Sequence, residues 1–178
     1  YGIYSKDGVP EIHWIEIPTG NFTMGSSREF DSLTAKDELP LREVYIERFF
    51  ISKYQITVGQ YEAFVVSGGY NNRKFWTDSG WEFIKSNNIS QPYFWRSPVY
   101  HISNHPIVGV CWYEAIAFCN WASEQLGYDI TLPTETQWEK ASRGTDGRIY
   151  PYGSTFEPYF ANFEPMGILR TSPVAVSY

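Results

Sequence analysis

The pattern of apolar and polar positions predicts several strands in the first third of the chain. Residues 13–18 alternate between apolar and polar side chains, and residues 22–25 form a second short run after a turn. We expect these two strands to pair as a hairpin. Residues 43–56 are rich in β-branched and aromatic side chains, which predicts further strand. The polar segment 26–40 has no periodicity and is interpreted as a surface loop.

Two capping boxes predict where helices begin. Residues 57–60 place a Thr three positions before a Gln, and the helix that follows is expected to run through Val66. Residues 134–137 repeat the arrangement and predict a helix that ends at Gly144. Trp138 and Ala141 are three residues apart and are expected on the inner face of that helix.

The longest predicted helix spans residues 112–126 and is followed by a Gly that suits its C-cap. Its apolar side chains spread around most of the circumference, so we expect burial on most sides. Residues 129–132 are interpreted as a brief strand. Residues 70–106 are irregular and dense in aromatic rings, with a short helix expected near 79–86. Helices and strands in this order indicate an α+β fold with much irregular structure.

Composition narrows the classes of partner. The net charge of −6 argues against nucleic acid as a partner, and no stretch approaches the roughly 20 apolar residues of a membrane span. Aromatic residues make up 19% of the chain. Most of these rings are expected in the core, but a long aromatic loop inside a compact domain usually has a function. Trp76, Trp81 and Trp95 are therefore our candidate ligand-binding residues.

The two cysteines are predicted to stay unpaired. Cys111 and Cys119 lie eight positions apart on one predicted helix, which separates them by about 12 Å. A disulfide needs Cα atoms within about 7 Å. Free thiols favour a reducing compartment such as the cytoplasm, or a partner cysteine elsewhere. Cys111 starts the helix and would be reactive if exposed, although we favour a buried, inert thiol. His101 and His105 have no third ligand nearby, so we do not favour a metal pair.

A series of segments in fixed order resembles one family. They are IPTGNFTMGSS (17–27), ELPLREVYIERFFISKYQITVGQYEAFV (38–65), NHPIVGVCWYEAIAFCNWAS (104–123), LPTETQWEKASRG (132–144), YPYG (150–153), AN (161–162) and TSPV (171–174). They resemble the formylglycine-generating-enzyme, or sulfatase-modifying-factor, family from Trp14 to Tyr178. The resemblance implies a C-type-lectin-like fold, and a single domain over residues 1–178 that lacks its carboxy-terminal part. A missing carboxy-terminal segment or a complementary chain is then the expected partner.

The resemblance also carries expectations about chemistry. Active members of the family oxidise a substrate cysteine in a sulfatase motif to Cα-formylglycine, with O₂ and a copper ion held by two cysteines. In the family those cysteines follow the part matched here, so copper is expected only if a missing segment supplies them. On this resemblance Cys111 replaces the usual Ser at its helix start. Cys119 matches a structural cysteine that can bridge to the missing half.

A calcium site is implied next to the AN motif. The implied ligands are Asn162 and the carbonyls of Phe163 and Ile168, while Met166 stands where the family has an Asp. Calcium prefers hard oxygen ligands and a thioether is soft, so we expect this site to be weakened.

Two functions remain open after this comparison. The first is a non-catalytic domain that binds a protein or peptide ligand, because the same fold displays ligands in variable proteins and positions substrates in ergothioneine-type sulfoxide synthases. The second is the front half of the copper-dependent oxidase. Fold alone does not choose between them, but the departures at Cys111 and Met166 favour the non-catalytic function.

Overall fold

The computed structural model describes residues 5–6, 8–29, 34–158, 160–162 and 168–175. The chain divides into two compact units. The first unit comprises residues 1–13, 52–132 and 161–178, and the second unit comprises residues 14–51 and 133–160. The single domain expected over residues 1–178 stays a prediction, and the units are described separately.

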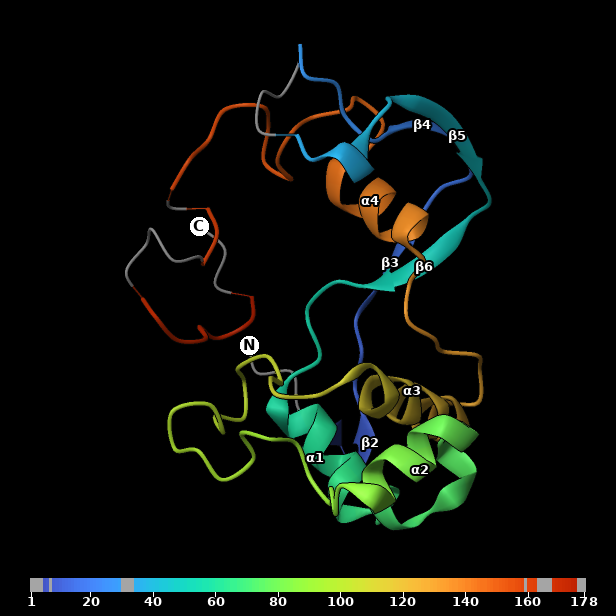
Figure 1. Ribbon diagram of the computed structural model, residues 1–178, viewed down its shortest axis with the longest axis vertical. Coiled ribbons are helices and arrows are strands. Elements are labelled where there is room, and N and C mark those ends of the chain that lie inside the picture. Colours follow the sequence, from blue (N-terminus) through green and yellow to red (C-terminus); the bar gives the residue numbers. More distant parts are fainter. Residues whose placement is uncertain (1–4, 7, 30–33, 159, 163–167, 176–178) are drawn as a thin grey trace. The chain divides into compact units, whose positions relative to one another are not determined.

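Four strands form two sheets of two strands each. They are β3 (Trp14–Ile17), β4 (Gly20–Met24), β5 (Arg42–Ile46) and β6 (Phe49–Ser52). Strand β3 pairs with β6, and β4 pairs antiparallel with β5 (Figure 1). The expected hairpin between β3 and β4 is therefore wrong. Pro18, between the strands, has no N–H to donate, and Gly20, the first residue of β4, has a φ of +136°. The backbone therefore turns toward new partners instead of folding back.

Helix α4 (Glu135–Arg143) follows the second capping box, as predicted. The Gln137 N–H donates to the Thr134 hydroxyl at 3.2 Å, and the Thr134 N–H donates to the Gln137 side chain at 2.9 Å. The expected inner position of Trp138 is wrong, because its side chain is 61% exposed. Lys140 is the buried residue of this helix, so a charged side chain occupies the inner face where an aromatic ring was expected.

The described residues of the segment 26–40, which are 26–29 and 34–40, are more ordered than a surface loop. It contains the short 3-10 helix η1 (Lys36–Glu38). Ser26 and Thr34 are buried, and the Thr34 hydroxyl donates to the Ser26 hydroxyl at 2.9 Å. The polar composition of the segment therefore reflects hydrogen bonds inside the second unit as well as contact with solvent.

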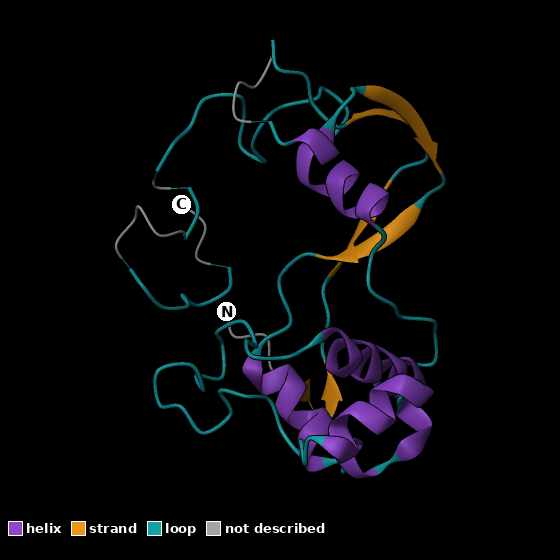
Figure 2. Cartoon of the chain, in the orientation of Figure 1, coloured by secondary structure: helices purple, strands orange, loops and turns teal. Residues whose placement is uncertain are grey.

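The first unit is mainly helical (Figure 2). Its elements are β1 (Ser5–Lys6), β2 (Val9–Pro10), α1 (Val58–Val66), η2 (Gly69–Asn71), η3 (Arg73–Phe75), α2 (Asp78–Ser86) and α3 (Trp112–Leu126). The predicted starts of α1 and α3 and the Gly127 C-cap are confirmed. The brief strand expected at 129–132 is wrong, because Ile130 instead bonds through its N–H and carbonyl to the Ser123 hydroxyl. Among the described residues, no helix is long and apolar enough to cross a membrane.

The core of the first unit is a cluster of aromatic rings around Phe64, which is fully buried. The Phe64 ring centroid lies 5.4 Å from that of Tyr61 and 5.7 Å from that of Trp121. Position 69 must be Gly, because a Cβ there would lie 2.0 Å from the Phe64 ring. Trp112 is 59% exposed, so the expectation that α3 is buried on most sides is wrong at its first turn. One face of α3 packs against the aromatic core, and the other face is exposed to solvent.

Candidate functional site

The charged residues of α4 hold the backbone of the second unit together. Lys140 is 3% exposed, and its ammonium donates to the carbonyls of Pro18 at 2.7 Å and Gly20 at 2.9 Å. The Glu139 carboxylate accepts from the Gly25 N–H at 2.6 Å. These three bonds reach residues at or next to the two ends of strand β4, so α4 fixes the strand in place.

Arg143 completes this arrangement with bonds to three carbonyls. Its guanidinium donates to Gly25 and Arg148, each at 2.6 Å, and to Gly147 at 2.9 Å. It also pairs with Glu139 at 2.7 Å, one helical turn away. The Glu139, Lys140 and Arg143 side chains of the motif LPTETQWEKASRG are therefore engaged by the fold itself, which gives these three residues a structural role.

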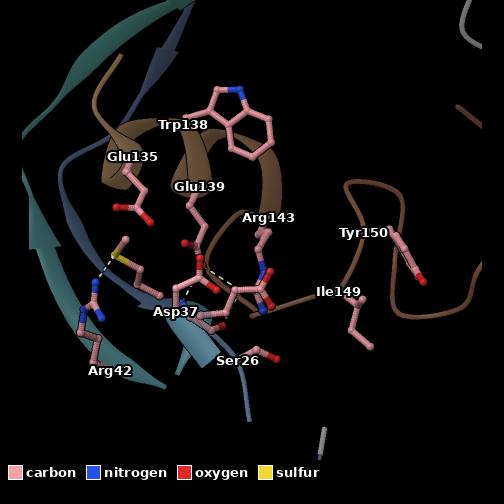
Figure 3. A pocket seen from close by; sticks show the side chains of 12 residues that line it. Ser26, Asp37, Arg42, Glu135, Trp138, Glu139, Arg143, Ile149 and Tyr150 are labelled. Carbon is pink, nitrogen blue, oxygen red and sulfur yellow. Dashed lines mark hydrogen bonds and ion pairs between the residues drawn. The ribbon is translucent and has the colours of Figure 1, made fainter. Parts of the chain in front are cut away.

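Beside these residues the second unit contains a pocket of about 380 Å³. Figure 3 shows its lining, in which Glu135 and Glu139 extend from the same side of α4 and Trp138 points away. The lining residues are Met24, Gly25, Ser26, Asp37, Glu38, Arg42, Glu135, Trp138, Glu139, Arg143, Ile149 and Tyr150. Sequence reasoning missed this pocket. The four-residue spacing of Glu135, Glu139 and Arg143 was a usable signal, because it places the three side chains on one helix face.

The first unit has a buried polar cluster at the start of α3. The Glu114 carboxylate accepts from the Tyr70 hydroxyl at 2.5 Å and from the Cys111 N–H at 2.8 Å. The Tyr61 hydroxyl lies 3.3 Å from that of Tyr70. Burial raises the pKa of both tyrosines far above the ordinary value, and the nearby Glu114 charge raises it further. Both tyrosines are therefore held as neutral phenols that donate hydrogen bonds.

Both cysteines are free thiols, as predicted. Burial raises the pKa of Cys119 to about 11. Burial also raises the pKa of Cys111 above the ordinary value, although the residue is only half-buried. A metal ion binds the thiolate and needs both ligands within bonding distance. Two protonated thiols about 12 Å apart along one helix do not fit a copper site.

The three candidate tryptophans occupy different environments. Trp76 is buried in the core cluster, and its indole N–H donates to the Gly69 carbonyl at 2.9 Å. Trp81 packs against the edge of that cluster, with the Lys85 ammonium 4.4 Å from its ring. Trp95 is half-buried, and its ring centroid lies 4.3 Å from that of His101. Trp76 therefore has a structural position, whereas Trp81 and Trp95 keep partly accessible faces.

The implied calcium ligands are described only in part. Phe163 and Met166 lie outside the described residues. The Asn162 side chain donates to the Arg170 carbonyl at 2.9 Å and to the Ser172 hydroxyl at 3.1 Å, while Ile168 is exposed. The amide nitrogen of Asn162 thus bonds residues 170 and 172, while its amide oxygen, a possible metal ligand, has no partner among the described residues.

The two histidines of the 101–105 segment face different groups. The His101 ring donates to the Trp95 carbonyl, and His105 lies 2.8 Å from the Thr171 hydroxyl. Burial lowers the pKa of His105, and the Arg170 charge lowers it further. Among the described residues, no three His, Cys, Asp or Glu side chains come together in a way that could hold a metal ion.

The chain has an α+β fold in which the motif LPTETQWEKASRG bonds helix α4 to the sheet of β4 and β5. This architecture indicates the class of protein. The chain belongs to the family described as "Sulfatase-modifying factor enzyme 1-like domain", whose model matches residues 4–170. This confirms the family that the sequence segments indicated. It also supports the coarser fold expectation, a mixture of helices and small sheets of the formylglycine-generating-enzyme type.

Relatives with different names share this similarity. The chain is 30% identical to "Formylglycine-generating enzyme" of Mus musculus, over 83% of this chain and 45% of that protein. It is 29% identical to "Inactive C-alpha-formylglycine-generating enzyme 2" of Bos taurus, over 85% and 56%, and 30% identical to "Hercynine oxygenase" of Mycobacterium tuberculosis, over 86% and 38%. The chain spans about half the length of the curated relatives it matches.

A solved structure supports the fold. "Structure of PvdO from Pseudomonas aeruginosa" aligns with a TM-score of 0.62 and 20% sequence identity, over 100% of this chain and 67% of that one. At this level of identity the likeness concerns the fold alone.

Proposed function

We propose that this chain is a non-catalytic domain that binds a protein or peptide ligand, with a C-type-lectin-like fold that a further segment or second chain completes. The observation that carries the proposal is the state of the two thiols. Cys119 belongs to the core of the first unit and Cys111 forms the N-cap of α3. Burial raises the pKa of both thiols, so neither is prepared to act as a nucleophile. Eight positions apart on one helix, or about 12 Å, they are also too far apart to hold one metal ion together.

Two further observations support this function. Glu139, Lys140 and Arg143 of α4 bond backbone groups of the second unit, which gives these three side chains a role in the fold. Large rings are exposed on each unit, such as Trp112 and Tyr93 on the first and Trp138 on the second. Exposed aromatic surface of this kind is typical of faces that another protein segment covers. The named inactive relative shows that the family includes members without the activity.

The alternative is part of a copper-dependent oxidase that converts a substrate cysteine to Cα-formylglycine. Its support is the 30% identity to proteins named formylglycine-generating enzyme. Because Cys111 and Cys119 do not fit a copper site, the oxidase would need a cysteine pair from outside this chain.

We also keep calcium at Asn162 as a proposal. Added calcium would then raise the melting temperature of the protein, and an Asn162→Ala variant would lose that effect.

A peptide assay separates the two functions. The protein, as isolated from its source, is incubated with a peptide carrying the sulfatase cysteine motif, copper, oxygen and a thiol reductant. Mass spectrometry then tests whether the CH₂SH group of the peptide becomes CHO. The proposed function predicts an unchanged peptide, and conversion would refute it.

Among the ring candidates, Trp95→Ala should weaken ligand binding without unfolding the protein, whereas Trp76→Ala should lower stability first.

A further inference from the structure

We propose that the pocket of the second unit binds a basic side chain, the guanidinium of arginine or the ammonium of lysine, presented by a peptide or protein. The inference rests on the proposed binding function and names the chemistry of the ligand. The charged side chains of the lining fall into two sets. Some are already neutralised by partners in the second unit, and most of the others have carboxylate oxygens without a partner among the described residues.

Two of the charged side chains in the lining, Glu139 and Arg143, are already engaged by other groups of the second unit. The Glu139 and Arg143 side chains are 16% and 13% exposed and pair with each other at 2.7 Å. Each also bonds backbone groups of the second unit. These two residues cancel in charge and are largely buried against each other, so they form the wall of the pocket and add no net charge to it.

The remaining charges are mostly negative. Asp37 and Glu135 line the pocket and have no hydrogen-bond or ion-pair partner among the described residues. Glu38 uses one carboxylate oxygen to accept the Ala35 N–H at 3.3 Å, which leaves the other available. The Arg42 guanidinium lies 3.3 Å from the Met24 sulfur, a weak acceptor. Three open carboxylates therefore face one cation, and the excess favours a positively charged ligand.

The apolar part of the lining suits the stem of such a side chain. Met24 is buried, and Ile149 and Tyr150 are half-buried on the side of the pocket opposite Arg42 (Figure 3). Lys and Arg pack their methylene chains against apolar surface while the charged end reaches polar groups. A volume of about 380 Å³ lies within the range of small-ligand sites.

A metal ion fits the pocket less well than an organic cation. Hard cations require several carboxylates around one point, and the described acidic residues form no such group. Carboxylates spread around a partly apolar cavity instead match the extended shape of a guanidinium or ammonium with its stem.

The test is a titration followed by amide chemical shifts, with Nα-acetyl-L-arginine N-methylamide as the probe and its uncharged citrulline counterpart as the matched control. The arginine probe should move the amide signals of residues 37 and 135–143, and the citrulline probe should not. Asp37→Asn and Glu135→Gln should each weaken arginine binding about 5-fold. Arg42→Gln should strengthen it, because it removes the opposing cation. Glu157→Gln, an exposed carboxylate of the same unit outside the lining, should change nothing.

Three results would overturn the inference. They are equal shifts with citrulline, shifts confined to the first unit, and Asp37→Asn and Glu135→Gln variants that bind as the parent does. Circular dichroism spectra of each variant establish that it is folded. The proposed non-catalytic function would survive any of these results, because it fails only if the peptide assay shows conversion of cysteine to formylglycine.

Discussion

Replacing Lys140 by Met tests whether the family motif serves the fold. Met keeps the length and the apolar stem of the side chain but removes the ammonium. The carbonyls of Pro18 and Gly20 then lose their donor from this buried position. The variant should fold with the same helix content and lower stability.

The expected loss can be worked from the contacts. A hydrogen bond from a charged donor contributes about 1.5–3 kcal/mol, and two are lost. Part of this is offset, because the variant no longer takes a charge out of water. The net destabilisation should be about 2 kcal/mol. With a urea m value of about 2 kcal/mol per M, the unfolding midpoint should fall by about 1 M.

Urea unfolding followed by circular dichroism measures this shift. Lys36→Met is the matched control, because Lys36 is exposed in the same unit and its replacement should change stability by less than about 0.5 kcal/mol. Equal midpoints for the parent and Lys140→Met would refute the structural role of the motif. A Lys140→Met variant of normal stability that had lost a peptide-converting activity would point to catalysis instead.

Three other substitutions test the first unit. Cys111→Ser should raise the free energy of unfolding by about 0.5–1 kcal/mol, because a hydroxyl caps a helix better than a thiol; a loss of stability in thermal melts would contradict this. Tyr70→Phe should lower it by about 2 kcal/mol, since the buried Glu114 carboxylate loses a donor, whereas Tyr93→Phe at an exposed ring should be neutral. The pKa of His105 is lowered by burial, so the unfolded chain takes up a proton before the folded chain does. Stability should therefore be complete above the ordinary pKa of histidine and fall as the pH drops below it. His105→Gln should flatten that slope in urea titrations, and an unchanged slope would refute the assignment.

Local signals in the sequence predicted the helices well. The caps at Thr57 and Thr134 and the Gly127 end satisfy backbone groups within one helical turn, so the information lies in a few neighbouring residues. Strand pairing depends on distant partners. The β3–β6 pairing joins segments more than 30 positions apart, and nothing in the alternation of residues 13–18 identifies its partner.

Burial was harder to predict than the elements themselves. Trp138 was expected inside from its spacing with Ala141, and Trp112 from the spread of apolar side chains around its helix, yet both are exposed. Lys140 was not expected inside, because a buried ammonium needs acceptors that only the folded chain provides. The pocket was missed for the same reason, since Asp37 and Glu135 are about 100 positions apart in the sequence and meet only in the second unit.

The reactivity of each cysteine as a function of pH decides whether the thiols of this chain are inert. Iodoacetamide alkylation of the protein, read separately for Cys111 and Cys119 by mass spectrometry, is repeated with and without Cu(I). Both thiols should be alkylated slowly at neutral pH and should gain no protection from copper. The Cys119 rate should rise only toward pH values near its pKa of about 11. Two thiols that react rapidly at neutral pH and are protected together by Cu(I) would contradict this prediction.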